Sequence, residues 1–513
     1  FPDYVGPMDA KAKELAMTAA SSQPLDDTPT ATQPASQPAD IAPVNGRLRL
    51  SVADAILVSL EHNQGLVVNR YRPPIVRTQE DVQRAVFDPM LSGEISSGRT
   101  WSPFSSPLTT TNGFLTLSEY LPTGTNLQFT AGGSDFSRGT DNANLDFTVT
   151  QSLLKGFGLD VNLASLRQAK LDTVSSQYEL RGFAQSLVAQ VEDAYWDYVL
   201  ATKQLDIFQK SYELAKQQRD ETLTRIEVGK LAPTEAAAAE AEVALRYENL
   251  INNIAAIEAL RIRLLQLINP NSKDLWNTKL DLTDQTSPTA VILDTVDDYV
   301  AYALRMRPDM NQARLQVERG DLEIVKTRNG LLPQLDFFVS LGRTGYAKMF
   351  NDAVSDLDGK GHNIVAGLSG SYPLLNRAAK AQDQRAHLSR DQSAAALENL
   401  AQTVQVDVRT AYVNVNRLEQ QIKATAATSR LQLITYQAEV EKFNLGKSTS
   451  FLVAQAQRDL VSAQINEVQA QVAYLKSLVD LHLLDGSLLE RRGITAPGDQ
   501  TMKMQGEKAA YAN

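Results

Sequence analysis

The feature that most constrains this chain is a stretch from Leu159 to Val228 that contains no proline and one glycine, Gly182. Apolar residues recur through it at alternating spacings of three and four, which predicts a coiled-coil helix. About 70 residues at ~1.5 Å each give a rod of roughly 105 Å. A rod of that length cannot be enclosed in an ordinary globular domain. Its two apolar stripes are Ala184, Val191, Tyr198, Leu205 and Tyr212, and Leu180, Leu187, Ala194, Ala201 and Phe208.

The helix should end near Gly229 and Lys230, and a second helix should begin at Pro233. Proline suits the first turn of a helix, where its missing N–H leaves no hydrogen bond unmade. The second helix should continue to Ile268 and stop at Asn269, because Pro270 follows. The two helices together predict a very long antiparallel α-hairpin.

The same hairpin occurs again later in the chain. Subtracting 217 from the residue number superimposes the second copy on the first, so that Tyr412 falls on Tyr195 and Gly446 falls on Gly229. A constant offset over this length indicates an internal duplication, and such a repeat decides the architecture. The superimposed stripe in the second copy is Ala401, Val408, Val415 and Ile422.

The segments before the hairpins also repeat, at an offset of 244, so that Leu60 matches Leu304 and Pro89 matches Pro333. Each half is predicted to start with a short amphipathic helix, at about 51–62 and 295–306. A second helical piece should follow, at about 74–88 and 309–331. Because Pro73 and Pro74 interrupt the first copy, its second helix should begin there.

Between the helices of each half lie segments with partial alternation of apolar and polar residues. They are 91–101, 113–120, 126–133 and 145–150 in the first half, and 334–346 and 363–374 around a polar loop, 348–361, in the second. Alternating strands of about 10 residues are typical of a transmembrane β-barrel. Aromatic residues in these segments are candidates for the membrane interface, with ordinary strand packing as the alternative. They are Tyr120, Phe129, Phe136, Phe338, Tyr346 and Tyr372.

The two strand regions differ in length by one hairpin. From Pro89 to Leu153 is 64 residues and from Pro333 to Leu374 is 41, a difference of 23. The extra pair is predicted to be 113–120 and 126–133, with a turn at 121–125. We expect this pair to stay outside the wall, which gives four strands per chain and about 12 in a trimer. The alternative is six per chain and about 18 in the trimer.

These patterns divide the chain into segments. Residues 1–46, with the Ser/Thr/Pro/Gln/Ala-rich stretch 21–46, are predicted to be a flexible N-terminal segment. The first repeat is short helices at 47–88, strands at 89–154 and a long helical hairpin at 155–269. A connecting segment, 270–294, leads to the second repeat, with short helices at 295–332, strands at 333–375 and a hairpin at 376–485. A tail, 486–513, follows.

Composition excludes several classes of function. A net charge of −10 argues against a nucleic-acid binder, which needs a basic face. The absence of cysteine removes thiolate zinc sites, iron–sulfur clusters and cysteine nucleophiles. No two of the four histidines form a local metal-binding pair. We therefore expect no catalytic, cofactor or metal site, and no enzyme.

Neither a long apolar run nor a targeting segment stands out. No run of about 18 apolar residues occurs. Phe1 to Tyr4 are not typical of a signal peptide, so an exported protein would be numbered from its cleavage site. The absence of cysteine at position 1 argues against an N-terminal lipid anchor.

The chain resembles the TolC-like outer membrane factor family. The repeated helix–strand–helix plan and five short motifs carry this resemblance, which covers about 48–490. The motifs are Gly229-Lys230 with Pro233-Thr234-Glu235, Leu445 to Phe451, Ala454 to Arg458, Gln151 to Gly158, and Tyr372 to Leu375. The resemblance implies a homotrimer whose strands close one β-barrel in outer-membrane lipid and whose helices form a periplasmic tunnel. It also implies a periplasmic adaptor and an inner-membrane pump as partners.

The hairpin ends are the candidate site. Because both hairpins end at equivalent positions, their tips should lie together at the periplasmic end, and we expect the tips to contact an adaptor. Simple helix-capping turns are the alternative. The tip residues are Gly229, Lys230, Gly446, Lys447 and Ser448.

An entrance constriction is expected beside the tips. In the family, carboxylates just after the second tip line the periplasmic entrance, whereas this chain has Leu452 and Gln455 there. Glu235, which matches Leu452 by the offset of 217, is the candidate for a carboxylate ring. The alternative is that Glu235 is a helix N-terminal residue favoured by the helix dipole. We also expect the tunnel to be closed at rest.

The sequence thus predicts a mixed α and β membrane protein with long coiled-coil hairpins, a trimeric barrel and an internal two-fold repeat. Its predicted function is a passive outer-membrane channel-tunnel, the exit duct of a tripartite efflux pump or a type I secretion system. The alternative is a periplasmic coiled-coil tether without transport, which leaves the strand pairs at equivalent positions unexplained.

Overall fold

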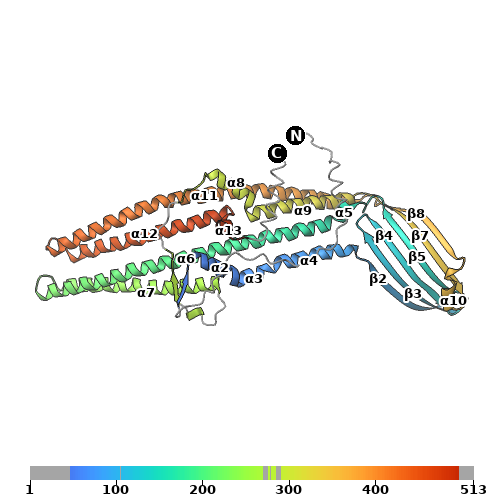
Figure 1. Cartoon of the computed structure of the whole chain (residues 1–513), viewed down its shortest axis with the longest axis horizontal. Helices are drawn as coiled ribbons and strands as arrows, with labels where there is room; N and C mark the ends of the chain where they lie inside the picture. The colour runs from blue at the N-terminus through green and yellow to red at the C-terminus, as the bar shows by residue number, and fades with distance from the viewer. Residues whose placement is uncertain (1–46, 104, 270–274, 278, 285–290, 496–513) are drawn as a thin grey trace, which may run out of the picture. The chain divides into compact units, whose positions relative to one another are not determined.

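The computed structural model describes residues 47–103, 105–269, 275–277, 279–284 and 291–495, all of which belong to one compact unit. Figure 1 shows long helices joined to a sheet. In chain order, the first half is β1 (Arg47–Leu50), α2 (Val52–His62), α3 (Gln64–Arg70), α4 (Arg72–Arg84), η1 (Ala85–Phe87), β2 (Met90–Ser102), β3 (Ser105–Leu121), β4 (Thr125–Phe136), β5 (Asp141–Ser152), α5 (Leu159–Asn162), α6 (Ala164–Glu227) and α7 (Thr234–Ile268).

The second half repeats this order with fewer strands. After η2 (Leu275–Asn277) and β6 (Lys279–Leu282) come α8 (Val296–Met306), α9 (Pro308–Gly330), β7 (Gln334–Ala347), α10 (Phe350–Ser355), η3 (Asp356–Asp358), β8 (His362–Ser371), α11 (Arg377–Asn444), α12 (Ser450–Leu484) and α13 (Leu488–Arg491). Among the described residues, no helix combines the length and the apolar character needed to cross a membrane.

The two predicted hairpins are confirmed. Helix α6 has 64 residues and packs against α7, and α11 has 68 residues and packs against α12. The returning helices α7 and α12 have 35 residues each, as the duplication requires. Helix α6 also contacts α12, so the hairpins lie side by side (Figure 1). The predicted start at Leu159 falls on the single turn α5, and α6 begins after Leu163.

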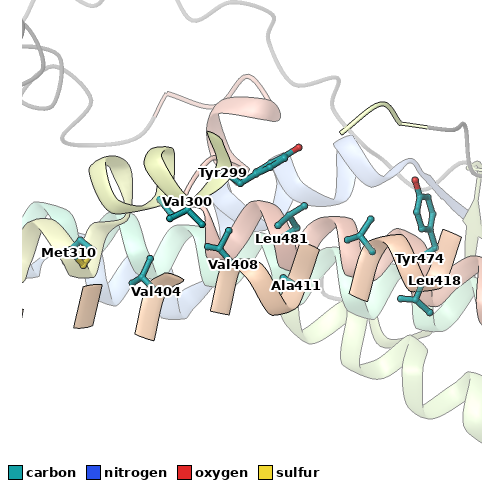
Figure 2. Close-up of a cluster of buried hydrophobic side chains, with 11 residues drawn as sticks. Tyr299, Val300, Met310, Val404, Val408, Ala411, Leu418, Tyr474 and Leu481 are labelled. Carbon is teal, nitrogen blue, oxygen red and sulfur yellow. The ribbon is translucent and has the colours of Figure 1, made fainter. Parts of the chain in front are cut away.

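The heptad stripes form the seams between these helices. In the first copy, Val191 and Tyr195 are fully buried on α6. In the second copy, a cluster of buried side chains joins α11 and α12 to the short helices α8 and α9 (Figure 2). Its members include Val404, Val408 and Val415 of α11, Leu481 of α12 and Val300 of α8. Burying each such side chain contributes roughly 1.5–3 kcal/mol, so these seams hold the long helices where the short helices cross them.

The predicted short helices are present, with matching N-caps in the two copies. The Ser51 side chain accepts from the Asp54 amide at the start of α2, and Thr295 and Asp298 repeat this contact in α8. Helix α4 begins at Arg72 with proline in its first turn, close to the predicted start. Helix α3 was not predicted from the sequence. Parallel pairing of β1 with β6 makes a small two-stranded sheet.

The remaining six strands form one antiparallel sheet in the order β2-β3-β4-β5-β7-β8 (Figure 1). The two halves of the chain meet where β5 pairs with β7. The predicted polar loop 348–361 connects β7 to β8 and contains two short helices, α10 and η3. Strand β8 ends at Ser371, before the predicted end at Leu374, because Pro373 has no amide hydrogen to donate.

The expectation of four strands per chain is wrong. Residues 113–120 lie in β3 and 126–133 lie in β4, and both strands are hydrogen-bonded on two sides within the sheet. The difference in length between the two strand regions indicates the extra hairpin, but it does not indicate whether the hairpin joins the sheet. Backbone N–H and C=O groups of two long strands need partners, and joining the sheet supplies these partners along the length of both strands.

Candidate functional site: the sheet faces and the hairpin tips

The register of the sheet sorts its side chains into two faces. Residues that pair across antiparallel strands point to the same side, and neighbours along a strand point to opposite sides. One row of successive partners crosses all six strands and contains only large apolar residues, each between 40% and 71% exposed. We call the side on which this row lies the apolar face. The row is Leu91, Leu117, Phe129, Phe147, Leu341 and Ile364.

The opposite side, which we call the polar face, carries hydroxyl, amide and carboxyl groups. Hydrogen bonds link its strands: Thr148 donates to Ser340 at 3.0 Å, and the hydroxyls of Thr116 and Thr130 lie 3.2 Å apart. One of its rows is Ser92, Thr116, Thr130, Asp146, Gly342 and Asn363. The charged residues that the register assigns to this face in the described strands are all acidic, namely Glu94, Asp146 and Asp336.

This two-faced sheet is suited to separate an apolar medium from an aqueous one. Of the aromatic residues predicted at the membrane interface, Phe129 is on the apolar face and Tyr120, Phe136, Phe338 and Tyr346 are on the polar face. Ordinary packing is therefore the better interpretation for these four. The Phe338 ring, for example, covers Gly367, where a Cβ atom would come within 2.8 Å of it. Tyr372 lies beyond the end of β8.

The two hairpin tips have the same backbone geometry. Gly229 and Gly446 both have φ of +73°, in the left-handed region that favours glycine. In the first tip, the Lys230 amide donates to the Arg225 carbonyl at 2.8 Å. In the second, Lys447 donates to the Lys442 carbonyl at 2.8 Å. Each long helix therefore ends in a Schellman motif, which supports the capping interpretation of the glycines.

Side chains connect the tips to each other. The Arg225 guanidinium carbon lies 4.1 Å from the centre of the Phe443 ring, and Nη2 donates to Asn444 Oδ1 at 3.2 Å. Ser450 at the start of α12 donates to the carboxylate of Glu235 at the start of α7. Glu235 is therefore half-buried and engaged by the other hairpin, a contact that a helix N-terminal role alone does not require.

The other predicted tip residues differ in their surroundings. Lys230, Lys447, Leu452 and Gln455 are exposed. The Ser448 hydroxyl donates to Glu439, and this hydrogen bond lowers the pKa of the Glu439 carboxyl, with help from Lys442.

Large apolar side chains at the tips were not singled out from the sequence. Val228, Leu445 and Phe451 are exposed beside the two turns. The sequence could have indicated them, because a large apolar residue stands next to each turn and a turn that contacts only water needs none. Exposed apolar residues of this kind are common in surfaces that bind another protein.

Charged residues, one of them buried and several half-buried, lie where the two hairpins pack together. Lys476 Nζ lies 3.0 Å from Asp197 and 3.8 Å from Asp193. Burial raises the pKa of Asp193 to about 6; Lys476 opposes the shift, and Asp480, Asp197 and Glu192 add to it. Glu192 is fully buried and accepts from Arg492 Nε at 2.8 Å; burial raises its pKa as well. Among the described residues, no group of His, Asp and Glu is arranged to hold a metal ion.

Comparison with known proteins identifies the same duplicated plan. The family profile described as "Outer membrane efflux protein" matches residues 58–269 and 300–487, one segment in each half of the repeat. No curated protein sequence matches the chain.

Three solved structures share the fold. The CmeC outer membrane channel of Campylobacter jejuni is 16% identical, with 89% of each chain covered and a TM-score of 0.65. The open MtrE outer membrane channel of Neisseria gonorrhoeae is 18% identical, with 85% of this chain and 89% of that chain covered and a TM-score of 0.62. The outer membrane protein VceC of Vibrio cholerae is 13% identical, with 85% and 96% covered and a TM-score of 0.64.

Proposed function

Because the chain belongs to the outer membrane efflux protein family, and is thus a channel protein of the outer membrane and not an enzyme, we propose that it is a trimeric exit duct. In this proposal a periplasmic adaptor and an inner-membrane pump deliver cargo to it, either for efflux or for type I secretion. The helical hairpins form the periplasmic tunnel, and the sheet forms the wall that crosses the membrane.

The two-faced sheet is the observation that carries this proposal. Its apolar face needs contact with lipid and its polar face needs water, and the wall of a pore supplies both. In a single chain, β2 and β8 are the edges of the sheet. Exposed edges of this length invite pairing, and pairing β2 of one copy with β8 of the next closes a ring. Three copies of six strands give about 18 strands.

The test is heat-modifiable migration of the protein from an outer-membrane fraction, since closed barrels resist unfolding in detergent until heated. A folded band that shifts on boiling supports the wall. A periplasmic tether without transport would fractionate with soluble proteins and show no such shift. That alternative also leaves the apolar face without an apolar partner.

We propose that the tips dock the adaptor. Two lysines, a half-buried serine and exposed apolar side chains lie together there, and hydrogen-bonded capping turns hold the backbone of both tips. Replacing Lys230 or Ser448 with tryptophan should abolish export and leave trimers intact. Lys203→Trp, at an exposed position within α6, is the matched control and should export normally. Unchanged export in both tip variants would count against docking here.

We also propose that the tips close the tunnel at rest, with Glu235 near the constriction. Glu235 and Ser450 already touch, and the chain has no cysteine, so Glu235→Cys with Ser450→Cys gives one unique thiol pair. Linking the pair with a short thiol crosslinker should hold the tips together and stop export. Equal conductance of linked and unlinked trimers would mean that the constriction lies away from the tips, and so not at Glu235, Leu452 or Gln455.

A further inference from the structure

The loop between β7 and β8 folds back over one end of the apolar face. Small residues make a row of register partners there: Gly113, Gly133, Ala143 and Gly345. A Cβ atom added at Gly133 would lie 2.7 Å from the Phe350 ring, and one at Gly345 would lie 2.0 Å from the Ala353 carbonyl oxygen. Helix α10 is therefore seated on this row, and Ala353 is completely buried.

The outward side of α10 continues the apolar face. Met349, Phe350 and Val354 are 42–64% exposed although all three are large and apolar. Asp356 accepts from the Tyr346 amide at 3.1 Å and fixes the loop in this position. Because α10 is on the apolar side of the sheet, it leaves the polar face open and meets whatever medium contacts the apolar face.

Basic residues lie on the apolar face next to α10, beyond the large apolar residues. Arg343 and His362 are direct register partners, in the row beside the small residues. Arg99 lies near the end of β2, with its guanidinium carbon 5.5 Å from the centre of the exposed Trp101 ring. Among the described residues, no ion pair joins Arg99 or Arg343 to a carboxylate. Four carboxylates of this region, Asp135, Asp352, Asp356 and Asp358, are also exposed.

The strand offset brings Arg99 level with Arg343 and His362. The row of Arg343 reaches β2 at Gly93, six residues before Arg99. Six residues at ~3.3 Å give about 20 Å along the strand, and five strand spacings of ~4.8 Å give about 24 Å across the sheet. A line through these positions makes an angle of about 40° with the rows of register partners. Strands in a closed barrel wall tilt by ~35–45° from the barrel axis, so this line would run parallel to the membrane plane.

The opposite ends of the strands have the same offset. Met90, the first residue of β2, is in the row that reaches β8 at Val365, six residues before β8 ends at Ser371. Both ends of the sheet are therefore offset in the same direction and by the same number of residues. In a ring of three copies, the basic residues and α10 would form one band around the wall.

We propose that Arg99, Arg343 and His362, together with the exposed apolar side of α10, bind lipids whose phosphate-bearing headgroups have a net negative charge. Guanidinium groups bind phosphate oxygens in pairs, and Trp101 suits the boundary between headgroups and acyl chains. Met349, Phe350 and Val354 contact the upper acyl chains. This inference rests on the proposed function, since it requires the apolar face to contact a membrane.

Trp101 provides the measurement. The full-length trimer is placed in phosphatidylcholine nanodiscs that contain the same fraction of either brominated phosphatidylglycerol or brominated phosphatidylcholine, and tryptophan quenching is recorded. We expect brominated phosphatidylglycerol to be enriched about two- to five-fold beside Trp101, from about 1 kcal/mol per basic residue at an anionic surface. Trp101→Phe should remove the quenched component, because Trp196 and Trp276 belong to the helical part.

The variants Arg99→Gln and Arg343→Gln should lose the preference for phosphatidylglycerol and keep the quenching by brominated phosphatidylcholine. Lys155→Gln, which removes a charge at the other end of the sheet, should keep both. Equal quenching by the two lipids in the unmodified protein overturns the preference for anionic headgroups while leaving the membrane wall in place. Quenching by neither lipid refutes the wall itself, and with it the proposed function.

Discussion

Placing an arginine on the apolar face tests the assignment of the two faces. Phe147 lies in the central apolar row, on β5 in the interior of the sheet. An arginine facing lipid at the middle of a bilayer costs about 2–4 kcal/mol. Phe147→Arg should therefore destabilise the folded, membrane-inserted state by roughly 6–12 kcal/mol per trimer, if each of three copies contributes that cost.

The neighbouring residue supplies the matched control. Thr148 is on the polar face, and Thr148→Arg loses only the hydrogen bond to Ser340, worth about 0.5–1.5 kcal/mol. The two variants should differ by roughly 1–3 kcal/mol per chain, or about 5- to 150-fold in the folding equilibrium. The assay is urea-dependent folding into bilayers, followed by the heat-modifiable band. Equal losses, or a larger loss for Thr148→Arg, would refute the assignment of the faces.

Three further outcomes follow from the geometry. Gly446→Ala should cost about 1–2 kcal/mol of local stability through its positive φ alone, since no atom lies within 4 Å of the added Cβ. Hydrogen exchange at the Lys447 amide should accelerate as a result. The control Gly182→Ala, inside α6, should instead stabilise the protein by about 0.5–1 kcal/mol. Asp193 has a folded pKa of about 6 against 3.8 when unperturbed, so its contribution to stability is full below pH 4 and is lost as pH rises through 6. Asp193→Asn should therefore show a smaller fall in melting temperature between pH 5 and 7. The same fall in melting temperature in this variant would contradict the desolvation of the Asp193 carboxyl. Because Glu94, Asp146 and Asp336 are the charged groups of the polar face, reversal potentials should indicate a preference for cations, weaker in Glu94→Gln with Asp146→Asn; identical potentials in that variant would assign selectivity to another part of the duct.

The sequence predicts the helices well because their signal is long. Heptads that continue over two copies of a hairpin average out local exceptions, so the ends near Gly229 and Gly446 were located correctly. Short elements have no such redundancy. Helix α10 has only six residues, among Asp and Gly, and α3 has seven, too few for a period to be visible.

The number of strands and the connections between the tips depend on contacts between residues that are far apart in the sequence. The extra 23 residues indicate one additional hairpin, but only pairing decides whether it joins a sheet, and pairing depends on residues far apart in sequence. The contacts of Arg225 with Phe443 and of Glu235 with Ser450 join residues more than 200 positions apart. The glycine turns were predictable because left-handed φ is a local property.

In the proposed duct, the polar face lines a water-filled pore. Single-channel recording in planar bilayers tests this claim most directly, using purified trimers whose insertion is confirmed by the heat-modifiable band. Discrete conductance steps are expected once the tips are opened, and their size should change when a bulky charge is placed on the polar face at Thr148. Inserted, folded trimers that never conduct, even when the tips are opened by separating Glu235 from Ser450, would contradict it.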